Sequence, residues 1–173
     1  ISGEDVKEFL QNLISNDIYK VNDNKSCFTS LLTPQGKFLY EFLIINHKSG
    51  FLVDCEKSQV DGLYKLLSIY KLRSKVEILN LSNEFVVAIL SKEKFLSLDN
   101  SKDEKGFTIK YREDSIFLDP RSKDLGARLV INLEKLHLSL KKLELKISDN
   151  KNYHQLSHNL GIAQIDTKKL QNK

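Results

Sequence analysis

A short turn between two apolar segments restricts the fold of this chain more than any other feature. Pro34-Gln35-Gly36 separates Ser26–Thr33 from Lys37–Ile45, and both flanking segments are rich in aromatic and β-branched residues. Proline fixes its own φ and glycine accepts a positive φ, so this spacing favours a tight turn. We therefore predict two strands joined by that turn.

The rest of the chain mixes helical and strand-like patterns. In Gly3–Ile14 and Glu56–Tyr70, apolar residues recur at the spacing of one helix face, and Ser2 stands where it can cap the first helix. Further strands are predicted at Phe51–Asp54, Val76–Leu81, Glu84–Leu90, Phe107–Arg112, Ser115–Leu118 and Arg128–Ile131, and further helices at Leu133–Lys142 and Tyr153–Leu160, the last closed by Gly161. This order predicts an α+β fold with antiparallel or mixed sheets.

The 173 residues suit one ordinary domain or two small ones. We expect a first α/β half at 1–82, a smaller β-rich half at 83–132 and a helical return segment at 133–173 that leads to a missing C-terminal part. No methionine is present, not even an initiator, so we expect the chain to be a piece of a longer protein.

The longest apolar runs are too short to cross a bilayer and no signal-peptide pattern is present, so a soluble, intracellular protein is expected.

The charge pattern argues against nucleic acid as a direct partner. There are 27 basic and 23 acidic residues, which leaves a net charge of +4, and the lysines are spread along the chain. Proteins that bind nucleic acid usually gather basic residues on one face or interleave them with aromatic residues. The seven glycines form neither a dinucleotide-binding nor a P-loop motif, and no serine-hydrolase elbow is present.

Neither the cysteines nor the histidines predict a metal site. Cys27 and Cys55 are far apart and in no CxxC pair, so we expect semi-buried free thiols, although only their geometry can exclude a disulfide. His154 and His158 are four residues apart on a predicted helix, which is a spacing that metal ligands use. No HExxH glutamate lies between them, so we expect solvated histidines.

The predicted strand Lys37–Ile45 contains a carboxylate in an apolar context. Neighbouring residues of a strand point to opposite faces, so Tyr40 and Glu41 should lie on different sides of the sheet. A carboxylate among leucines is costly unless it binds something or lies at the mouth of a cleft. The other interpretation is an open sheet face beside water, and the pattern leaves both open.

A second polar group surrounds the turn Asp119-Pro120-Arg121, with Arg128 nearby in the sequence. The proline between Asp119 and Arg121 fixes the backbone geometry of this pair. One interpretation is a salt-bridged turn. The other is a loop that contacts an anion or a partner, because arginine pairs well with planar anions.

Five blocks of the sequence resemble the YgfZ-type folate-binding proteins, which are relatives of the glycine-cleavage T protein. In chain order they are FLQNLISNDI (9–18), TPQGKFLYEFLI (33–44), YKLRSKVEI (70–78), DPRSKDLGARL (119–129) and YHQLSHNLGIAQ (153–164). They occur in the family's order and cover essentially the whole chain. The resemblance implies the GcvT/YgfZ-like folate-binding fold, with the C-terminal barrel of that family absent from this chain.

The resemblance also implies roles for individual residues. True T proteins carry an Asp-Asp pair where this chain has Tyr40-Glu41, and that pair supplies the catalytic carboxylate beside N10 of tetrahydrofolate. Glu41 is then the candidate catalytic residue, but it is one methylene longer, and a displacement of about 1 Å can cost ~10²-fold in rate. Phe28 would form an aromatic wall for the pterin, and Asp54 would stand where T proteins use asparagine. With Tyr40 and Glu41 they make up the implied tetrahydrofolate site.

Tyr40-Glu41 is most similar to the branch that holds the mitochondrial iron–sulfur assembly factor and its α-proteobacterial relatives, which carry Tyr-Asp there. The implied function is a folate-binding protein that assists assembly or repair of iron–sulfur proteins and affects tRNA modification indirectly. Its implied partners are iron–sulfur proteins or their assembly machinery. A bacterial protein would work in the cytoplasm and a eukaryotic one in the mitochondrial matrix.

The alternative is a tetrahydrofolate-dependent aminomethyltransferase of the glycine cleavage system, which the loss of the Asp-Asp pair disfavours, so a non-enzymatic role is preferred. The family's Lys-Gly-Cys-Tyr-x-Gly-Gln-Glu motif would follow the block around Leu160–Lys173 and does not occur in the chain.

Overall fold

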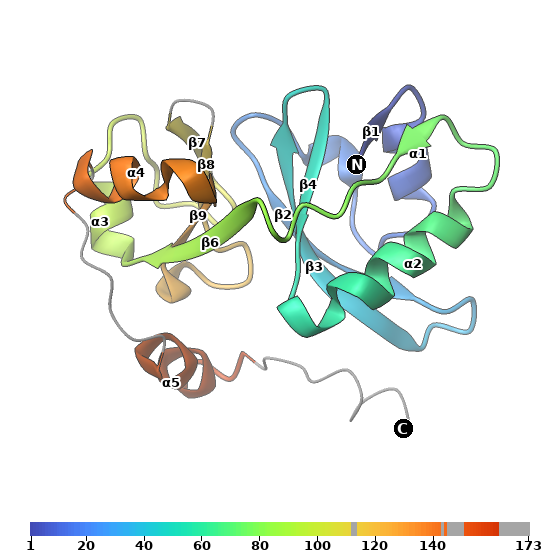
Figure 1. Cartoon of the computed structure of the whole chain (residues 1–173). Helices are drawn as coiled ribbons and strands as arrows, with labels where there is room; N and C mark the ends of the chain where they lie inside the picture. The colour runs from blue at the N-terminus through green and yellow to red at the C-terminus, as the bar shows by residue number, and fades with distance from the viewer. Residues whose placement is uncertain (112–113, 143, 145–150, 163–173) are drawn as a thin grey trace. The chain divides into compact units, whose positions relative to one another are not determined.

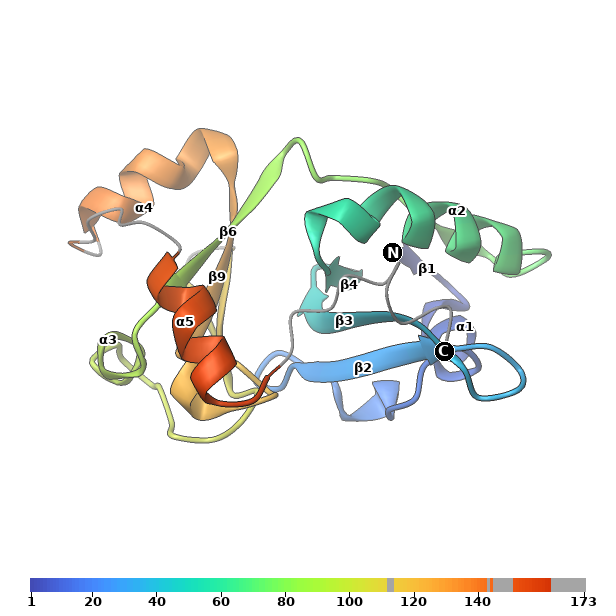
Figure 2. The same ribbon diagram turned by 90° about the horizontal axis from the view of Figure 1, so that it is seen from below.

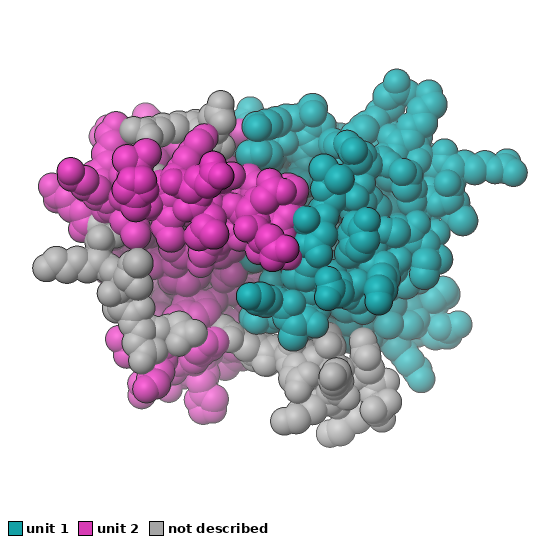
Figure 3. Space-filling view, viewed as in Figure 1, with its two compact units in different colours: residues 1–80, 165–173 teal, residues 81–164 magenta. Residues whose placement is uncertain are grey.

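The computed structural model describes residues 1–111, 114–142, 144 and 151–162. Contacts divide the chain into unit 1, which includes residues 1–80, and unit 2, which runs from 81 to 164 (Figure 3). Each unit has its own antiparallel sheet and its own helices, which confirms the predicted α+β class. The boundaries at 82 and 132 stay a prediction. Arg112 and residues 163–173, which earlier expectations include, lie outside the described residues.

Unit 1 is built on a five-stranded sheet. Its elements are β1 (Ser2–Gly3), α1 (Val6–Gln11), η1 (Ile18–Lys20), β2 (Cys27–Leu32), β3 (Phe38–His47), β4 (Gly50–Asp54), η2 (Lys57–Gln59), α2 (Val60–Tyr70) and β5 (Val76–Glu77) (Figure 1). The strand order is β2-β3-β4-β1-β5 with antiparallel pairing throughout. Helix α2 lies along one face of this sheet, as Figure 2 shows.

The β2–β3 hairpin confirms the turn predicted around Pro34. Gly36 donates a backbone hydrogen bond to Thr33 O at 2.8 Å, and Thr33 N donates to Lys37 O at 2.8 Å. Gly36 has φ +77°, a conformation that L side chains rarely adopt. The turn therefore closes through the glycine, and an irregularity between Leu31 and Leu32 then shifts the register, so that Leu32 is opposite Phe38 and Leu31 is opposite Tyr40.

The predicted helix Gly3–Ile14 is wrong at its start. Ser2 does not cap a helix, because it pairs with Gly50 of β4 and Glu77 of β5 as part of β1. Gly3 has φ +128°, which no helix accepts, and α1 begins only at Val6. Pairing with distant strands decides the conformation here, and no local pattern reports such pairing.

The predicted strand Val76–Leu81 is also too long. Only Val76 and Glu77 form β5, because its partner β1 is itself two residues long. The backbone N–H of Lys75 donates to the Asp5 carboxylate at 2.7 Å, which ties the start of β5 to the start of α1.

Unit 2 is built on a four-stranded antiparallel sheet in the order β6-β9-β8-β7. Its elements are β6 (Phe85–Leu90), α3 (Lys92–Leu96), β7 (Thr108–Tyr111), β8 (Asp114–Leu118), η3 (Lys123–Leu125), β9 (Ala127–Asn132), η4 (Leu133–Lys135), α4 (Leu136–Lys142) and α5 (Lys151–Asn159). The sequence pattern did not predict α3, whose first turn is capped by Ser91, with Lys94 N donating to Ser91 Oγ at 3.1 Å. Gly161 closes α5 with φ +66°, as predicted.

The core of unit 1 joins the sheet to its helices. Phe42 and Ile44 of β3 are buried with Leu63 and Leu67 of α2 in one hydrophobic cluster. Cys27 belongs to the same cluster, and Cys55 packs against it. Both cysteines are free thiols, as the sequence predicts.

Burial changes the acidity of both thiols. It raises the pKa of Cys27 from 9.0 to about 11, helped by the negative charge of Asp17. It raises the pKa of Cys55 from 9.0 to about 12, with further contributions from the charges of Asp54 and Glu56. The folded protein therefore holds both groups as neutral thiols.

We predict that these thiols make unit 1 less stable at high pH. A raised folded-state pKa stabilises the folded form below the unfolded value near 9, and this stabilisation is lost as the pH rises from there toward the folded value. The free energy of unfolding in urea should fall between about pH 8.5 and about pH 10.5. The Cys27→Ala, Cys55→Ala double variant is the control, and an equally steep fall in it would contradict this explanation.

Candidate functional site

Three of the predicted folate-site residues lie on one face of the unit 1 sheet. Phe28 of β2 is directly opposite Leu43 of β3, and Leu43 is directly opposite Asp54 of β4. Residues opposite each other in neighbouring strands share a face of the sheet. Glu41 precedes Leu43 by two residues, so its side chain also points to this face.

The exposure of these residues fits a surface that a ligand can reach. Phe28, Glu41 and Asp54 are partly exposed, whereas Leu43 between them is 4% exposed. The row Phe28–Leu43–Asp54 across the three strands therefore has a buried leucine in the middle, an aromatic side chain at one end and a carboxylate at the other. Glu41 lies next to this row, opposite Ser30 of β2.

Tyr40 does not join this face. It is opposite Leu31, whose side chain is in the core, and it packs against the same core cluster. The Tyr40 hydroxyl lies so close to Gly62 of α2 that a Cβ on residue 62 would meet it at 2.5 Å. Tyr40 therefore helps to set how closely α2 approaches β3, and its predicted part in folate binding stays a prediction.

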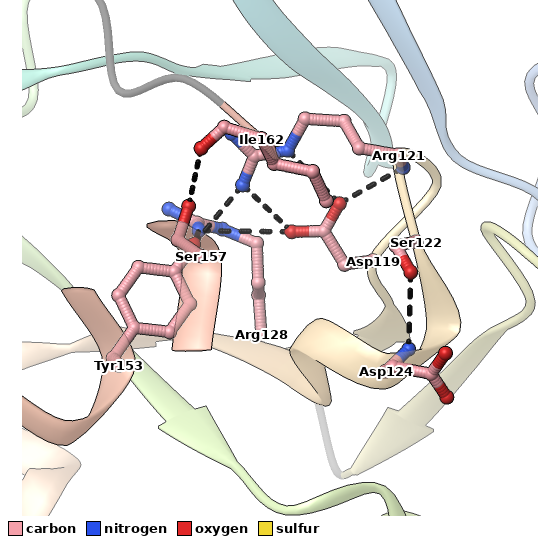
Figure 4. Close-up of polar contacts among 8 residues, drawn as sticks. All are labelled: Asp119, Arg121, Ser122, Asp124, Arg128, Tyr153, Ser157 and Ile162. Atoms are coloured by element: carbon pink, nitrogen blue, oxygen red, sulfur yellow. Dashed lines mark hydrogen bonds and ion pairs between the residues drawn. The ribbon is translucent and has the colours of Figure 1, made fainter. Parts of the chain in front are cut away.

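A second polar group is built within unit 2 from three separate elements (Figure 4). Asp119 follows β8, and Arg121 donates to it twice, from Nε to Oδ1 at 3.0 Å and from Nη2 to Oδ2 at 2.8 Å. Arg128 of β9 lies 3.9 Å from the same carboxylate. Tyr153 of α5 accepts hydrogen bonds from Arg121 at 3.0 Å and from Arg128 at 3.1 Å.

Because the group is buried, its charged side chains depend strongly on one another. The Asp119 side chain is fully buried, and those of Arg121 and Arg128 are 14% and 15% exposed. Burial by itself lowers the pKa of Arg121, but the hydrogen bonds and charge of Asp119, aided by Tyr153, raise it overall. The two guanidinium groups share one carboxylate and one phenol oxygen, so the Asp119–Pro120–Arg121 turn has the geometry of a salt-bridged turn. A binding role for Asp119, Arg121 and Arg128 stays a prediction.

Sequence reasoning missed Tyr153 as a member of this group. It lies 32 residues from Arg121, and its helix shows no charge or polarity signal that points to an arginine pair. The end of α5 is fixed locally, because Ser157 Oγ donates to Ile162 O at 2.7 Å. The tyrosine's membership is visible only when α5 is placed beside η3 and β9.

Other candidate features lie elsewhere. His154 and His158 are exposed, and among the described residues no three histidine, cysteine or acidic side chains are grouped so that they could hold a metal ion.

An open hollow of about 750 Å³ is lined by α1 and the turn after α2, and it includes none of the predicted site residues. In the part of the chain that the structure describes, no helix combines the length and apolar character that a membrane span needs.

We predict that Asp119→Asn strongly destabilises unit 2. The substitution leaves two nearly buried guanidinium groups without their carboxylate, which costs about 3–5 kcal/mol. Tyr153→Phe removes one acceptor from both arginines and should cost about 1–3 kcal/mol. Urea unfolding measures both changes. Asp124→Asn is the control, because Asp124 is 65% exposed and loss of its charge should change the unfolding free energy by about 0.5 kcal/mol or less. If Asp124→Asn destabilised the protein as much as Asp119→Asn, the explanation by the buried Asp119–arginine pairs would be refuted.

The sequence is similar to proteins of two named kinds. It is 25% identical to "Iron-sulfur cluster assembly factor IBA57 homolog, mitochondrial" of Dictyostelium discoideum, over 95% of this chain and 46% of that protein. It is 27% identical to the protein of that name from Pyricularia oryzae, over 96% of this chain and 41% of that protein. The "Aminomethyltransferase" of Bacillus pumilus is 29% identical over 60% of this chain and 28% of its own length.

The fold is similar to that of a solved aminomethyltransferase. The structure matches that of glycine cleavage system aminomethyltransferase T from Bartonella henselae with a TM-score of 0.65 and 12% sequence identity. The match covers 82% of this chain and 41% of the other. No family model matches the sequence.

The chain spans less than half of the length of the curated relatives that it matches. The sequence likeness extends over nearly all of its residues, and the likeness in fold extends over most of them. The chain is therefore a homologue of the IBA57-type assembly factors and of the aminomethyltransferases, and it has the GcvT-like fold of the latter.

Proposed function

We propose that this chain is the folate-binding part of a protein that assists the assembly or repair of iron–sulfur proteins. The observation that supports it most is the common face of Phe28, Glu41 and Asp54, three residues that the resemblance assigns to a tetrahydrofolate site. The homologues named as iron–sulfur cluster assembly factors support the second half of the proposal.

The chemistry of this face fits tetrahydrofolate. A pterin is planar and packs well on an aromatic ring, which Phe28 offers. Its amino and ring N–H groups are donors, and Glu41 and Asp54 are carboxylates that accept such hydrogen bonds. The buried Leu43 between them keeps the floor of the row apolar.

The assembly role fits better than aminomethyl transfer. The IBA57 homologues from Dictyostelium and Pyricularia match 95% and 96% of the chain, whereas the aminomethyltransferase from Bacillus pumilus matches 60%. The position of the first T-protein carboxylate is held by Tyr40, which points into the core. This leaves Glu41 as the single carboxylate of the pair.

The partners follow from the proposal. Iron–sulfur proteins or their assembly machinery would be the protein partners, and an effect on tRNA modification would be indirect, through an iron–sulfur enzyme. The protein would work in the mitochondrial matrix of a eukaryote, since the names of the relatives include the word mitochondrial, and in the cytoplasm of a bacterium.

We predict saturable binding of tetrahydrofolate that depends on Glu41. Replacing its carboxylate by an amide in Glu41→Gln removes a charge-assisted hydrogen bond and should weaken binding about tenfold. Phe28→Ala should weaken it by a similar factor through loss of stacking. Isothermal titration calorimetry with the purified chain measures both dissociation constants.

The control for this titration is Glu8→Gln, since Glu8 is an exposed carboxylate on α1 and lies away from the common face. Tyr40→Phe should also bind normally if Tyr40 only packs against Gly62. An absence of saturable binding in the unaltered chain would remove the folate half of the proposal and leave the assembly half standing.

We predict that cells without the gene lose activity of iron–sulfur enzymes. Expression of the unaltered gene should restore these activities, and the Glu41→Gln gene should restore them only in part if folate is needed. The activities of several iron–sulfur enzymes in extracts measure this. Unchanged activities, together with tetrahydrofolate-dependent ammonia release from an aminomethyl-lipoyl carrier, would favour the aminomethyltransferase instead.

A further inference from the structure

The open hollow of unit 1 lies between α1 and the turn that follows α2 (Figure 1). On the α1 side its lining residues are Asp5, Glu8, Phe9 and Asn12, which are spaced as neighbours on one face of a helix. At a rise of about 1.5 Å per residue this stripe is about 10 Å long. The other side of the hollow is formed by residues 72–74.

Leu72 has an unfavourable place at the rim of this hollow. It directly follows Lys71, the last residue of α2's cap, and has φ +42°, a left-handed conformation that glycine adopts most readily after a helix. Its side chain is 87% exposed, the highest value among the large apolar side chains of the described residues. Neither the backbone strain nor the apolar exposure stabilises unit 1, so the fold gives no reason for a leucine here.

Arg73 brings a positive charge to the same rim. Among the described residues nothing forms an ion pair or hydrogen bond with its guanidinium group. The neighbouring charges are already engaged, because Lys75 Nζ pairs with Glu4 at 2.7 Å and Lys75 N donates to the Asp5 carboxylate at 2.7 Å. Arg73 can therefore pair with a carboxylate from outside the chain.

We propose that this hollow binds an extended segment of a partner protein in which an apolar side chain stands next to a single acidic residue. The apolar side chain would cover Leu72, and the acidic one would pair with Arg73. Glu8 lines the hollow as well, and its carboxylate would repel a run of acidic residues. The complementary segment therefore carries one negative charge at this place and not several.

The dimensions of the hollow favour a peptide over a small ligand. An extended chain rises about 3.3 Å per residue, so about three residues span the stripe along α1. Sites for small molecules usually enclose most of the ligand, whereas this hollow is open along its length. Because Phe28, Glu41 and Asp54 do not line it, binding here does not depend on the proposed folate site.

A library of short random peptides displayed on phage tests the proposal on the whole chain. Free Leu72→Gly, Arg73→Ala double variant is added in excess, so that peptides which bind elsewhere are removed. We expect the retained peptides to share an apolar residue beside one aspartate or glutamate. One such peptide is then synthesised, and isothermal titration calorimetry measures its dissociation constant.

We expect the dissociation constant to rise about tenfold or more in Leu72→Gly, through loss of apolar contact, and in Arg73→Ala, through loss of the charge-assisted hydrogen bond. Glycine accepts a positive φ without strain, so Leu72→Gly should unfold in urea at no lower a concentration than the unaltered chain. Weaker binding in this variant would then not come from a damaged fold.

The matched controls lie on α2 outside the hollow. Ile69→Ala removes an apolar side chain that is 65% exposed, and Lys65→Ala removes an exposed positive charge. Both should leave the dissociation constant unchanged.

Three results would overturn the proposal. The first is that the selection retains no peptide. The second is a retained peptide that Leu72→Gly or Arg73→Ala binds as tightly as the unaltered chain does. The third is retention of purely acidic peptides, which would indicate a general anion site.

Discussion

The antiparallel ladder that joins β2, β3 and β4 determines which side chains of unit 1 lie together. Side chains alternate along β3, so Phe42 and Ile44 enter the core under α2 while Glu41 and Leu43 point to the other face. The turn closed by Gly36 joins β2 to β3, and the shift between Leu31 and Leu32 gives the register in which Phe28 lies opposite Leu43. A shift of one residue in the pairing of β3 would move Glu41 to the buried side of the sheet, where a carboxylate is costly.

This constraint also explains how one strand can stabilise the fold on one face and present the proposed folate-site residues on the other. The face toward α2 carries the apolar contacts, so the opposite face is free to carry Phe28, Glu41 and Asp54 without loss to the core. Tyr40 shows the separation most clearly, because it neighbours Glu41 in sequence yet packs beside Gly62.

Unit 2 depends on an interaction of another kind. Asp119 brings two arginines together inside the protein, and Tyr153 joins α5 to them through two hydrogen bonds. Gly126 allows this loop to pass close to the Leu90 carbonyl, where any Cβ would overlap it. Because a buried charge without its partner is costly, these residues are mutually dependent although they come from distant parts of the sequence.

The sequence by itself determined the β2–β3 hairpin, the helix α2, the order of most strands and the opposite orientation of Tyr40 and Glu41, because turn chemistry and side-chain periodicity are local. It did not determine that Ser2 joins a strand or that Tyr153 reaches Arg121 and Arg128. Each of these depends on contacts between residues far apart in the chain. Only the tertiary structure decided them, since the free energy of such contacts comes from burial and pairing that local sequence does not encode.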